Sequence, residues 1–279
     1  MIATYHNHTT WSDGKRSPEA MYDSAVAQGI NELGISDHLT LHPSDERVSW
    51  SMDPTRVEEY VQSISALRDR APNGPVVRVG VEVDYFPGHA SRIKAVLDSL
   101  ELDFVVGSVH FVGEHTIDGN PDIWAAMGDS ERDDAHCRYW QLLAELAGSG
   151  LADIAAHLDL PKKFGLYTKT DMTPLVEVAL DAIAGSNMVV ELNTAGWYAP
   201  CAEAYPGLEI LRACRRREIP VTISADAHAP SHLLRDFGHA VRVLREVGYE
   251  TVARFAHRNV RLEPIGEAIP QPWTADAGG

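Results

Sequence analysis

The sequence predicts a single-domain α/β protein whose strands form a distorted seven-stranded (β/α)7 barrel of the TIM type. Apolar runs alternate with helical stretches from end to end, which is the pattern of repeated βα units with parallel strands. The chain has 279 residues, 44% of them hydrophobic, and is long enough for one large core. Six histidines, two aspartates and one glutamate stand at or near the ends of these runs. A barrel would gather such positions at one mouth.

Seven apolar runs are the expected strands. They cover residues 2–6, 31–36, 76–84, 104–110, 152–156, 188–193 and 220–225. Parallel strands joined by right-handed helical crossovers can close into a barrel. We expect the barrel to occupy residues 1–269, followed by a flexible tail over residues 270–279.

Two helix starts carry a capping signal. Ser17 precedes Pro18 and Asp53 precedes Pro54, so each pair places a capping side chain before a proline at the first helical position. The later helices are expected over residues 90–100, 131–147, 174–185, 205–217 and 231–247.

The net charge of −16 argues against a long nucleic acid as partner, because the protein would repel a phosphate backbone. The one basic cluster, Arg212 with residues 215–217, is typical of the solvated end of a helix. Divalent cations would make the barrel mouth less negative than the whole protein. A small phosphorylated metabolite therefore remains a compatible partner.

The three cysteines, Cys137, Cys201 and Cys214, include no closely spaced pair and are expected to be reduced thiols. Met1 leads straight into the first expected strand without a charged and apolar leader. No uninterrupted apolar run approaches the roughly 18 residues of a membrane span. We expect a cytoplasmic protein without a membrane segment, and the sequence leaves the oligomeric state open.

The nine polar residues at the strand ends predict a metal site. His6 and His8 lie two apart on an extended segment, so both imidazoles can reach one cation. The other candidate ligands are Asp13, His38, Glu82, His110, His157, Asp226 and His228. One cation accepts about four to six ligands, so nine donors imply two or three ions. Zinc, manganese and iron all suit mixed imidazole and carboxylate ligands.

The same residues lie in motifs that occur in the order seen in the polymerase and histidinol phosphatase (PHP) superfamily. The motifs are His6-x-His8, Ser12-Asp13-Gly14, Ser36-Asp37-His38, Gly80-Val81-Glu82-Val83-Asp84-Tyr85, Gly107-Ser108-Val109-His110, Ala156-His157-Leu158-Asp159 and Asp226-Ala227-His228. The chain resembles this superfamily nearly throughout. The stretches at residues 82–88, 107–111 and 191–196 resemble its histidinol-phosphatase branch.

The resemblance implies three metal ions and a division of their ligands. By similarity, one ion is held by His6, His8 and Asp226, a second by His110 and His157 with Glu82 bridging the pair, and a third by Asp13, His38 and His228. Glu82, Asp226 and His228 are also the expected catalytic residues.

The resemblance further implies a phosphomonoesterase that hydrolyses L-histidinol phosphate in histidine biosynthesis. A metal-activated hydroxide would attack phosphorus, while the general acid for the leaving group stays open. Two departures concern the leaving group rather than the metal ligands. Trp197 and Tyr198 follow Gly196 where the branch often has a basic residue, and Ala225 and Ala229 flank the last Asp-Ala-His where polar residues are usual.

Basic residues near the strand ends are candidates for the phosphate group. Lys162 and Lys163 lie in the loop beyond the fifth strand, and Lys15, Arg16 and Arg235 are further candidates. The alternative for each is a solvated loop side chain.

The amine and imidazole of histidinol phosphate call for carboxylates and aromatic rings outside the metal ligands. Asp84 and Asp159 are candidate substrate carboxylates, although either would equally serve to orient a ligand imidazole. Phe111, Trp197 and Tyr198 are candidates for an aromatic wall, with core packing as the alternative.

Three other functions compete with this interpretation. A PHP-type phosphoesterase that acts on nucleotides or short oligonucleotides would share the ligands, but the acidic composition disfavours it. Amidohydrolase barrels also begin with His-x-His, but they usually bridge their metals with a lysine, whereas Glu82 is the candidate here. A metal-binding regulatory module without catalytic activity is disfavoured by the complete ligand set.

Overall fold

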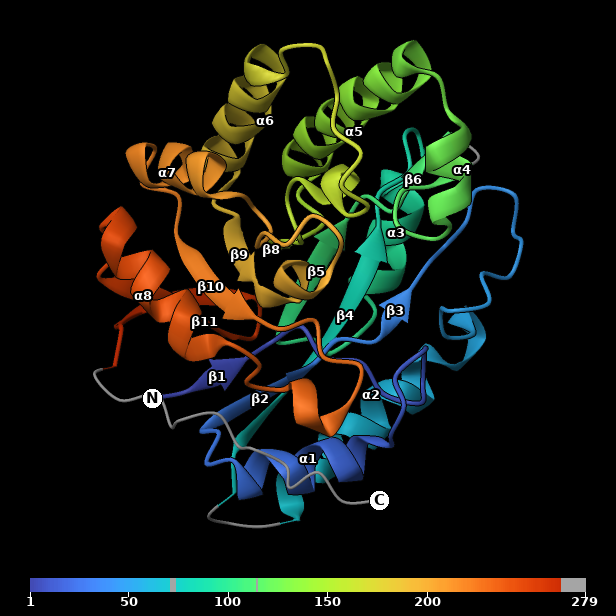
Figure 1. Ribbon diagram of the computed structural model, residues 1–279. Helices are drawn as coiled ribbons and strands as arrows, with labels where there is room; N and C mark the ends of the chain where they lie inside the picture. Colours follow the sequence, from blue (N-terminus) through green and yellow to red (C-terminus); the bar gives the residue numbers. More distant parts are fainter. Residues whose placement is uncertain (71–73, 114, 267–279) are drawn as a thin grey trace, which may run out of the picture.

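A sheet of parallel strands forms the centre of the molecule, as seen in a computed structural model that describes residues 1–70, 74–113 and 115–266. The strand order is β1–β2–β4–β5–β8–β9–β10, and the short strand β3 pairs with β4 as well (Figure 1). The strands are β1 (Ala3–Thr4), β2 (Glu32–Ile35), β3 (His38–Leu39), β4 (Val76–Asp84), β5 (Phe104–Ser108), β8 (Ile154–Ala155), β9 (Val189–Asn193) and β10 (Val221–Ser224). Each of the seven predicted strands is present, and several are shorter than predicted.

The first and last strands of the sheet meet just beyond their carboxyl ends. Asn7 and Ala227 form a parallel bridge, in which His8 N–H donates to Ala227 O at 2.8 Å and Ala227 N–H donates to His6 O at 3.1 Å. The sheet is therefore a nearly closed barrel, and the predicted fold class is confirmed.

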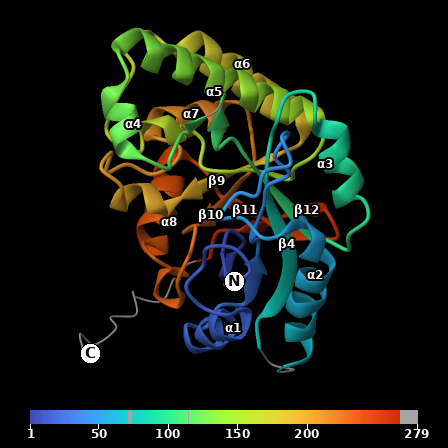
Figure 2. The same ribbon diagram turned by 90° about the vertical axis from the view of Figure 1, so that its right-hand side faces the viewer.

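Eight α-helices connect the described strands and cover the outside of the barrel. They are α1 (Pro18–Ala27), α2 (Val57–Ala66), α3 (Ala90–Leu97), α4 (Pro121–Ala126), α5 (Asp129–Ser149), α6 (Thr173–Ser186), α7 (Leu208–Arg216) and α8 (Phe237–Val247). Helices α5 and α6 lie side by side in both ribbon views (Figures 1 and 2). Within the described ranges, none of these helices combines the length and the apolar character that crossing a membrane requires.

Both predicted capping signals are present. The Ser17 hydroxyl accepts the N–H of Ala20 at 3.4 Å, and the Asp53 carboxylate accepts the N–H of Thr55 at 3.0 Å. Asp53 starts a short 3-10 turn that runs directly into α2. The expected helix over residues 231–247 begins later, at α8, because Asp236 has a positive φ of 56° and interrupts the helical backbone.

Several strands and one helix were not predicted from the sequence. They are the short strand β3, the short helix α4, the hairpin of β6 (Phe111–Val112) and β7 (His115–Thr116), and the hairpin of β11 (Thr251–Ala256) and β12 (Asn259–Pro264). The first hairpin follows His110 directly and so lies beside the predicted metal site. The second packs against the other end of the barrel.

Aromatic side chains fill the lower part of the barrel. Tyr5 packs edge-on against Phe104 and Phe255, with ring centroids 5.3 and 4.9 Å apart. Gly80 faces the Phe104 ring, where a Cβ atom would come within 2.3 Å of a ring carbon. Because Phe255 belongs to β11, the hairpin plugs the amino-terminal end of the barrel (Figure 2). The barrel interior is therefore filled by packed side chains on this side, and the candidate metal ligands lie at the opposite mouth.

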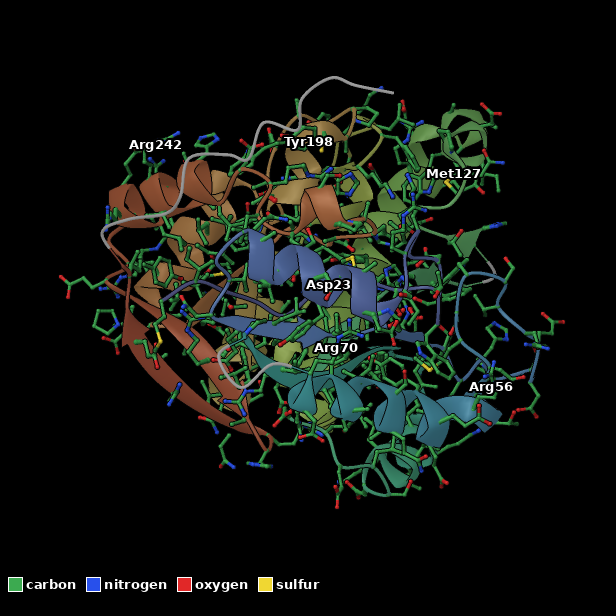
Figure 3. All side chains as sticks on the ribbon, turned by 90° about the horizontal axis from the view of Figure 1, so that it is seen from below. Asp23, Arg56, Arg70, Met127, Tyr198 and Arg242 are labelled. Atoms are coloured by element: carbon green, nitrogen blue, oxygen red, sulfur yellow. The ribbon has the colours of Figure 1, made fainter. Side chains whose placement is uncertain are left out.

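Asp23 on α1 forms an ion pair with Arg70, which follows α2 in the chain, at 3.3 Å; both residues are labelled in the view from below (Figure 3). The three cysteines are free thiols, as expected, and Cys201 and Cys214 are buried. The predicted boundary at residue 269 and the tail of residues 270–279 lie outside the described residues.

Candidate metal centre

The segment after β1 delivers two histidines to the barrel mouth. His6 and His8 flank Asn7, which bridges the last strand, and both imidazoles are buried and point the same way. His6 Nε2 lies 3.0 Å from Glu82 Oε2, and His8 Nε2 lies 3.2 Å from Asp226 Oδ1. Burial lowers the pKa of His8 to about 3, which keeps its imidazole in the neutral form that binds metals.

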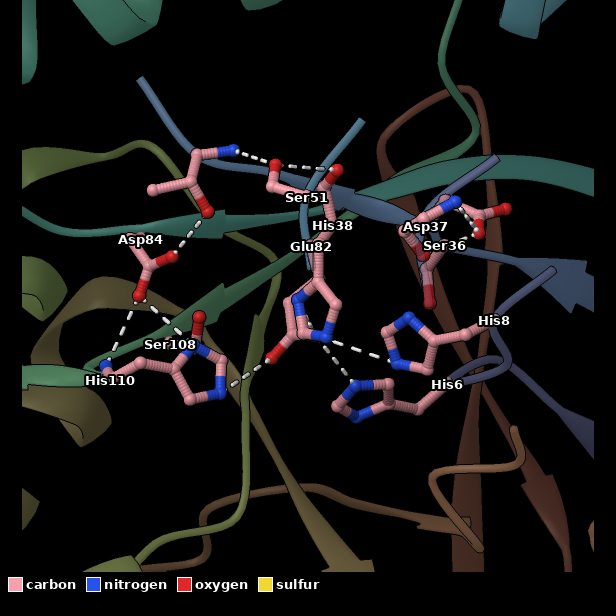
Figure 4. A network of polar contacts seen from close by, with 12 residues as sticks. His6, His8, Ser36, Asp37, His38, Ser51, Glu82, Asp84, Ser108 and His110 are labelled. Carbon is pink, nitrogen blue, oxygen red and sulfur yellow. Dashed lines mark hydrogen bonds and ion pairs between the residues drawn. The ribbon is translucent and has the colours of Figure 1, made fainter. Parts of the chain in front are cut away.

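Glu82, near the end of β4, lies at the centre of the site and is 1% exposed. Its Oε2 atom is 3.0 Å from His6 Nε2 and 2.9 Å from His38 Nδ1, and its Oε1 atom is 3.6 Å from His110 Nε2 (Figure 4). The Oε1 atom also lies 3.1 Å from His157 Nε2. Burial opposes ionisation, but the charges of His6, His38 and His110 hold the pKa of Glu82 well below its usual range. The two oxygens of one carboxylate thus face four imidazoles.

A second group lies toward the outside of the mouth. His228 Nε2 is 3.2 Å from Asp13 Oδ1, His38 Nε2 is 3.8 Å from the same oxygen, and His228 Nδ1 is 3.5 Å from Asp226 Oδ1. Burial disfavours a charged His228, but its hydrogen bond with Asp13 raises the pKa of His228 to about 9. Asp13 therefore belongs to the site although its side chain is about one-third exposed.

The structure brings all nine predicted ligands together in four overlapping groups whose donor atoms lie within 4.8 Å of one another. The groups are His8, Asp13, His38 and His228; His6, Glu82 and His157; His6, His8 and Asp226; and His38, Glu82 and His110. The group of His6, His8 and Asp226 coincides with one implied by the family resemblance, and the outer group adds His8 to another. The assignment of individual ligands to individual ions stays a prediction.

The donor geometry fits divalent metal ions. Two donors that bind one ion at about 2.1 Å, with angles near 90–110°, lie about 3.0–3.4 Å apart, close to the 2.9–3.2 Å contacts at Glu82 and Asp226. Three buried atoms that could bind a metal, His8 Nε2, His38 Nδ1 and Asp226 Oδ1, make short contacts but no contact with hydrogen-bond geometry within the described part of the chain. Such burial costs free energy that a bound cation would offset.

Two of the predicted ligands hold the backbone in a conformation that L-residues rarely adopt. His157 has a φ of 23° and Asp226 a φ of 49°. Backbone strain of this kind costs on the order of 1–3 kcal/mol and is concentrated at functional sites. The loops after β8 and β10 therefore hold these side chains at the mouth against their local preference.

Glu191 on β9 orients two of these histidines and is a functional residue to which the sequence had assigned no role. Its carboxylate contacts His6 Nδ1 at 2.9 Å and accepts hydrogen bonds from the N–H of His157 at 2.6 Å, the Ser224 hydroxyl at 2.7 Å and the Asn193 amide at 2.9 Å. The signal for this role was available, because Glu191 and Asn193 are the polar residues at the end of the sixth predicted strand. A ligand imidazole is commonly held by such a carboxylate.

Asp37 similarly fixes the loop that carries Asp13. It accepts the N–H and hydroxyl of Thr9 at 2.7 and 2.8 Å, and the N–H and hydroxyl of Ser12 at 3.1 and 2.6 Å. Because Asp37 lies at the end of the predicted second strand, it couples this loop to the barrel.

Asp84 lies behind His110 rather than in the open part of the mouth. It is 2% exposed and contacts His110 Nδ1 at 2.9 Å, accepts the N–H of His110 at 3.1 Å, and accepts the Thr40 hydroxyl at 2.7 Å (Figure 4). Its surroundings favour the alternative role of orienting a ligand imidazole over the predicted contact with substrate.

Lys162 and Asp159 form an ion pair in which the lysine is buried. Lys162 is 2% exposed, and its ammonium donates to Asp159, Glu203 and the backbone oxygen of Ala204, each at 2.9 Å. Three acceptors satisfy all three donors of an ammonium group. The structure therefore disfavours the predicted phosphate contact of Lys162 and the predicted substrate contact of Asp159.

The other basic candidates remain accessible around the mouth. Lys163 is about one-third exposed and donates to Asp118 Oδ2 at 3.1 Å. Lys15 and Arg16 are exposed on the loop after Asp13. Arg235 stacks on the Tyr198 ring and donates to the backbone oxygen of Ala225 at 3.3 Å.

The predicted aromatic wall divides into two places. Phe111 packs against Trp50, with centroids 6.0 Å apart and planes inclined by 24°. Trp197 instead stacks on His239 at 4.2 Å, and Tyr198, labelled in Figure 3, is 60% exposed and bonded to Asp236. Trp50 lies in an irregular loop without a periodic pattern, so no feature of the sequence indicated its place beside the site.

Known proteins match the chain over most of its length. The family model of the PHP domain matches residues 4–195. The probable histidinol-phosphatase of Deinococcus radiodurans is 35% identical over 246 residues, which cover 88% of this chain and 92% of that protein. The match confirms the resemblance seen in the motifs.

Two solved structures share the fold. The histidinol phosphate phosphatase of Lactococcus lactis, solved in complex with zinc, L-histidinol and phosphate, has a TM-score of 0.79 at 21% identity, covering 93% of this chain and 98% of that one. The putative histidinol phosphatase of Listeria monocytogenes has a TM-score of 0.76 at 21% identity, covering 85% and 99%.

Proposed function

Because the chain belongs to the PHP domain family, we propose that it is a metal-dependent phosphomonoesterase that hydrolyses L-histidinol phosphate to L-histidinol and phosphate in histidine biosynthesis. The observation that carries the proposal is the convergence of imidazoles and carboxylates on Glu82 at the open mouth of the barrel. The 35% identity to a probable histidinol-phosphatase over nearly the full length supports the choice of substrate.

The proposed ligands are the nine residues of the four groups, and their donor types suit two to three zinc, manganese or iron ions. Bound divalent ions would lower the pKa of water so that it can attack phosphorus, and would neutralise charge on the phosphate. Glu82 would bring its negative charge within reach of more than one such ion, while Glu191 and Asp84 hold the imidazoles of His6 and His110 in place.

Arg235 is our proposed protein contact to the phosphate group. It follows β10 in the same loop as Asp226 and His228, and its guanidinium is held 4.2 Å from the centre of the Tyr198 ring. Its Nε atom is buried without a hydrogen-bond partner among the described residues. Guanidinium groups bind phosphate oxygens through paired hydrogen bonds, and this geometry leaves donors available. Lys15, Arg16 and Lys163 stay further candidates for a contact with the phosphate group. We also propose that the protein is cytoplasmic.

The test compares substrates and metal content in protein purified without chelator. We expect more than one transition-metal ion per chain, and a higher kcat/KM for L-histidinol phosphate than for p-nitrophenyl phosphate, because the amine and imidazole position the ester. Nucleoside bisphosphates and a short oligonucleotide complete the panel. A tenfold preference for a nucleotide would reject the substrate while leaving the metallophosphatase intact. One ion or fewer per chain in active protein would reject the clustered metal site.

A further inference from the structure

An aromatic surface borders the metal centre on the side of β6. Trp50, from the loop between β3 and α2, lies with its ring centroid 4.6 Å from that of His38 and 5.4 Å from that of His110. Phe111 follows His110 directly and packs on Trp50 with nearly parallel planes. Phe86, 5.3 Å from Phe111, supports it from behind. Trp50 and Phe111 are only partly buried, so they form a wall beside two proposed ligands.

A carboxylate accompanies this wall. Asp118 follows the β6–β7 hairpin, and the adjacent Ile117 N–H donates to His110 O at 2.7 Å, which ties this segment to the centre. Lys163 donates to Asp118 Oδ2 at 3.1 Å and to its backbone oxygen at 3.2 Å, and the Asp118 side chain is 28% exposed.

Asp118 differs from the two carboxylates that the sequence had offered for the substrate amine. Asp84 is buried behind His110, and Asp159 is taken up by Lys162. Asp118 keeps an exposed edge, and its Oδ1 atom can accept a donor in addition to the lysine on Oδ2. Lys163 thus fixes the carboxylate without excluding a second cation.

We infer that Trp50, Phe111 and Asp118 recognise the organic half of the substrate: the rings pack on a heteroaromatic ring, and Asp118 binds a protonated amine. Aromatic rings in contact add binding energy beyond that of their buried area, and a hydrogen bond between ammonium and carboxylate is strengthened by charge. Trp50 lies beside the His110 ring, and Ile117, next to Asp118, is hydrogen-bonded to the His110 backbone. In the inferred arrangement, one small molecule reaches the wall and the carboxylate while its phosphate lies over the metal ligands. The inference rests on the proposed function.

Two truncated esters separate the two contacts. Phosphoethanolamine keeps the amine and lacks the ring, whereas 3-(imidazol-4-yl)propyl phosphate keeps the ring and lacks the amine. Asp118→Asn should lower kcat/KM for L-histidinol phosphate and phosphoethanolamine at least tenfold, and that for the ester without an amine less than twofold. Trp50→Leu should show the complementary pattern, with loss confined to the two substrates that carry the ring.

Matched controls remove the same groups elsewhere. Asp45→Asn takes a charge from the exposed end of the Trp50 loop, and Trp197→Leu removes the tryptophan that stacks on His239. Both variants should leave kcat/KM for all three esters unchanged from wild type. The constant for competitive inhibition by L-histidinol reports binding alone, without the chemical step. Asp118→Asn should weaken this inhibition at least tenfold, whereas inhibition by 3-(imidazol-4-yl)propanol should change less than twofold.

The outcomes distinguish this inference from the proposed function. Equal loss on all three esters in Asp118→Asn and Trp50→Leu would overturn substrate recognition and leave the phosphatase assignment standing. A wild-type protein that prefers a nucleotide would overturn the proposed function, and the inference with it. Loss of metal in either variant would likewise assign that residue to the support of the centre instead of the substrate.

Discussion

The two ends of the barrel both bury charged side chains, but the partners of Asp103 at the amino-terminal end differ from those of Glu82 and Asp226 at the carboxyl end. Asp103, directly before β5, is 1% exposed. It accepts hydrogen bonds from Arg68 at 2.6 Å, from the N–H of Val79 at 2.9 Å and from the N–H of His257 at 3.2 Å. These bonds join β4, β5 and the β11–β12 hairpin, so the Asp103 carboxylate contributes to stability.

At the carboxyl end, the buried carboxylates and imidazoles that could bind metal face one another instead. Glu82 and Asp226 are surrounded by imidazoles, and atoms of His8, His38 and Asp226 have no hydrogen-bond partner within residues 1–70, 74–113 and 115–266. An unsatisfied buried polar group costs about 1–3 kcal/mol. The contrast teaches that hydrogen bonds within the protein account for the buried charge of Asp103 at the amino-terminal end. The buried groups at the carboxyl end, Glu82 and Asp226 with their histidines, instead suit the binding of metal ions.

Replacing Glu82 by glutamine gives the largest expected effect. The amide has nearly the same shape but no negative charge, so it cannot compensate positive charge beside four imidazoles. We expect kcat/KM for L-histidinol phosphate to fall at least about a thousandfold, or about 4 kcal/mol. Metal content should be measured on the same preparation. Turnover close to that of wild type with unchanged metal content would show that Glu82 has no central role.

Asp103→Asn makes the opposite prediction at the other end of the barrel. The change leaves the guanidinium of Arg68 without its buried partner and weakens the bonds that hold the hairpin. The free energy of unfolding in urea should fall by about 2–3 kcal/mol. At a temperature where the variant stays folded, its kcat/KM should match wild type. A large loss of turnover in fully folded protein would mean that the two ends are functionally coupled.

The nine proposed ligands could be predicted because each stands at or near the end of an apolar run. The barrel rule turns that order along the chain into one location, without any knowledge of loop structure. Residues in irregular loops carry no such signal. Trp50 and Asp118 reach the centre only because the 42–53 loop and the β6–β7 hairpin fold back beside His110.

The plug of the barrel was missed for a local reason. The turn between β11 and β12 is formed by His257 and Arg258, which both have positive φ, at 50° and 60°. Two-residue hairpin turns of this type usually contain Asn or Gly, so the sequence lacked the expected turn signal. The ion pair of Lys162 with Glu203 could not be predicted from the sequence either, because the two residues are 41 positions apart in the chain.

Glu191→Gln should have the smallest of these effects, and it tests how far the functional network extends below the ligands. Four donors converge on Glu191, among them His6, His157 and Ser224, so the amide of the variant places hydrogens where an acceptor is needed. Replacing a carboxylate that orients a metal ligand typically costs 10- to 100-fold in metal affinity or activity, and we expect a loss of kcat/KM in about this range. Excess metal should restore part of it.

The matched control for Glu191 is Glu32→Gln, at the lower end of the barrel. Glu32 is also buried and accepts a hydrogen bond from Arg78 at 2.7 Å, but it lies on β2, away from the mouth. This variant should lose stability and keep kcat/KM and metal affinity. Glu191→Gln could instead behave like Glu32→Gln, with lower stability and unchanged metal affinity. In that case the functional network would not extend to β9. The buried carboxylate of Glu191 would then belong to the part of the barrel whose charges serve folding.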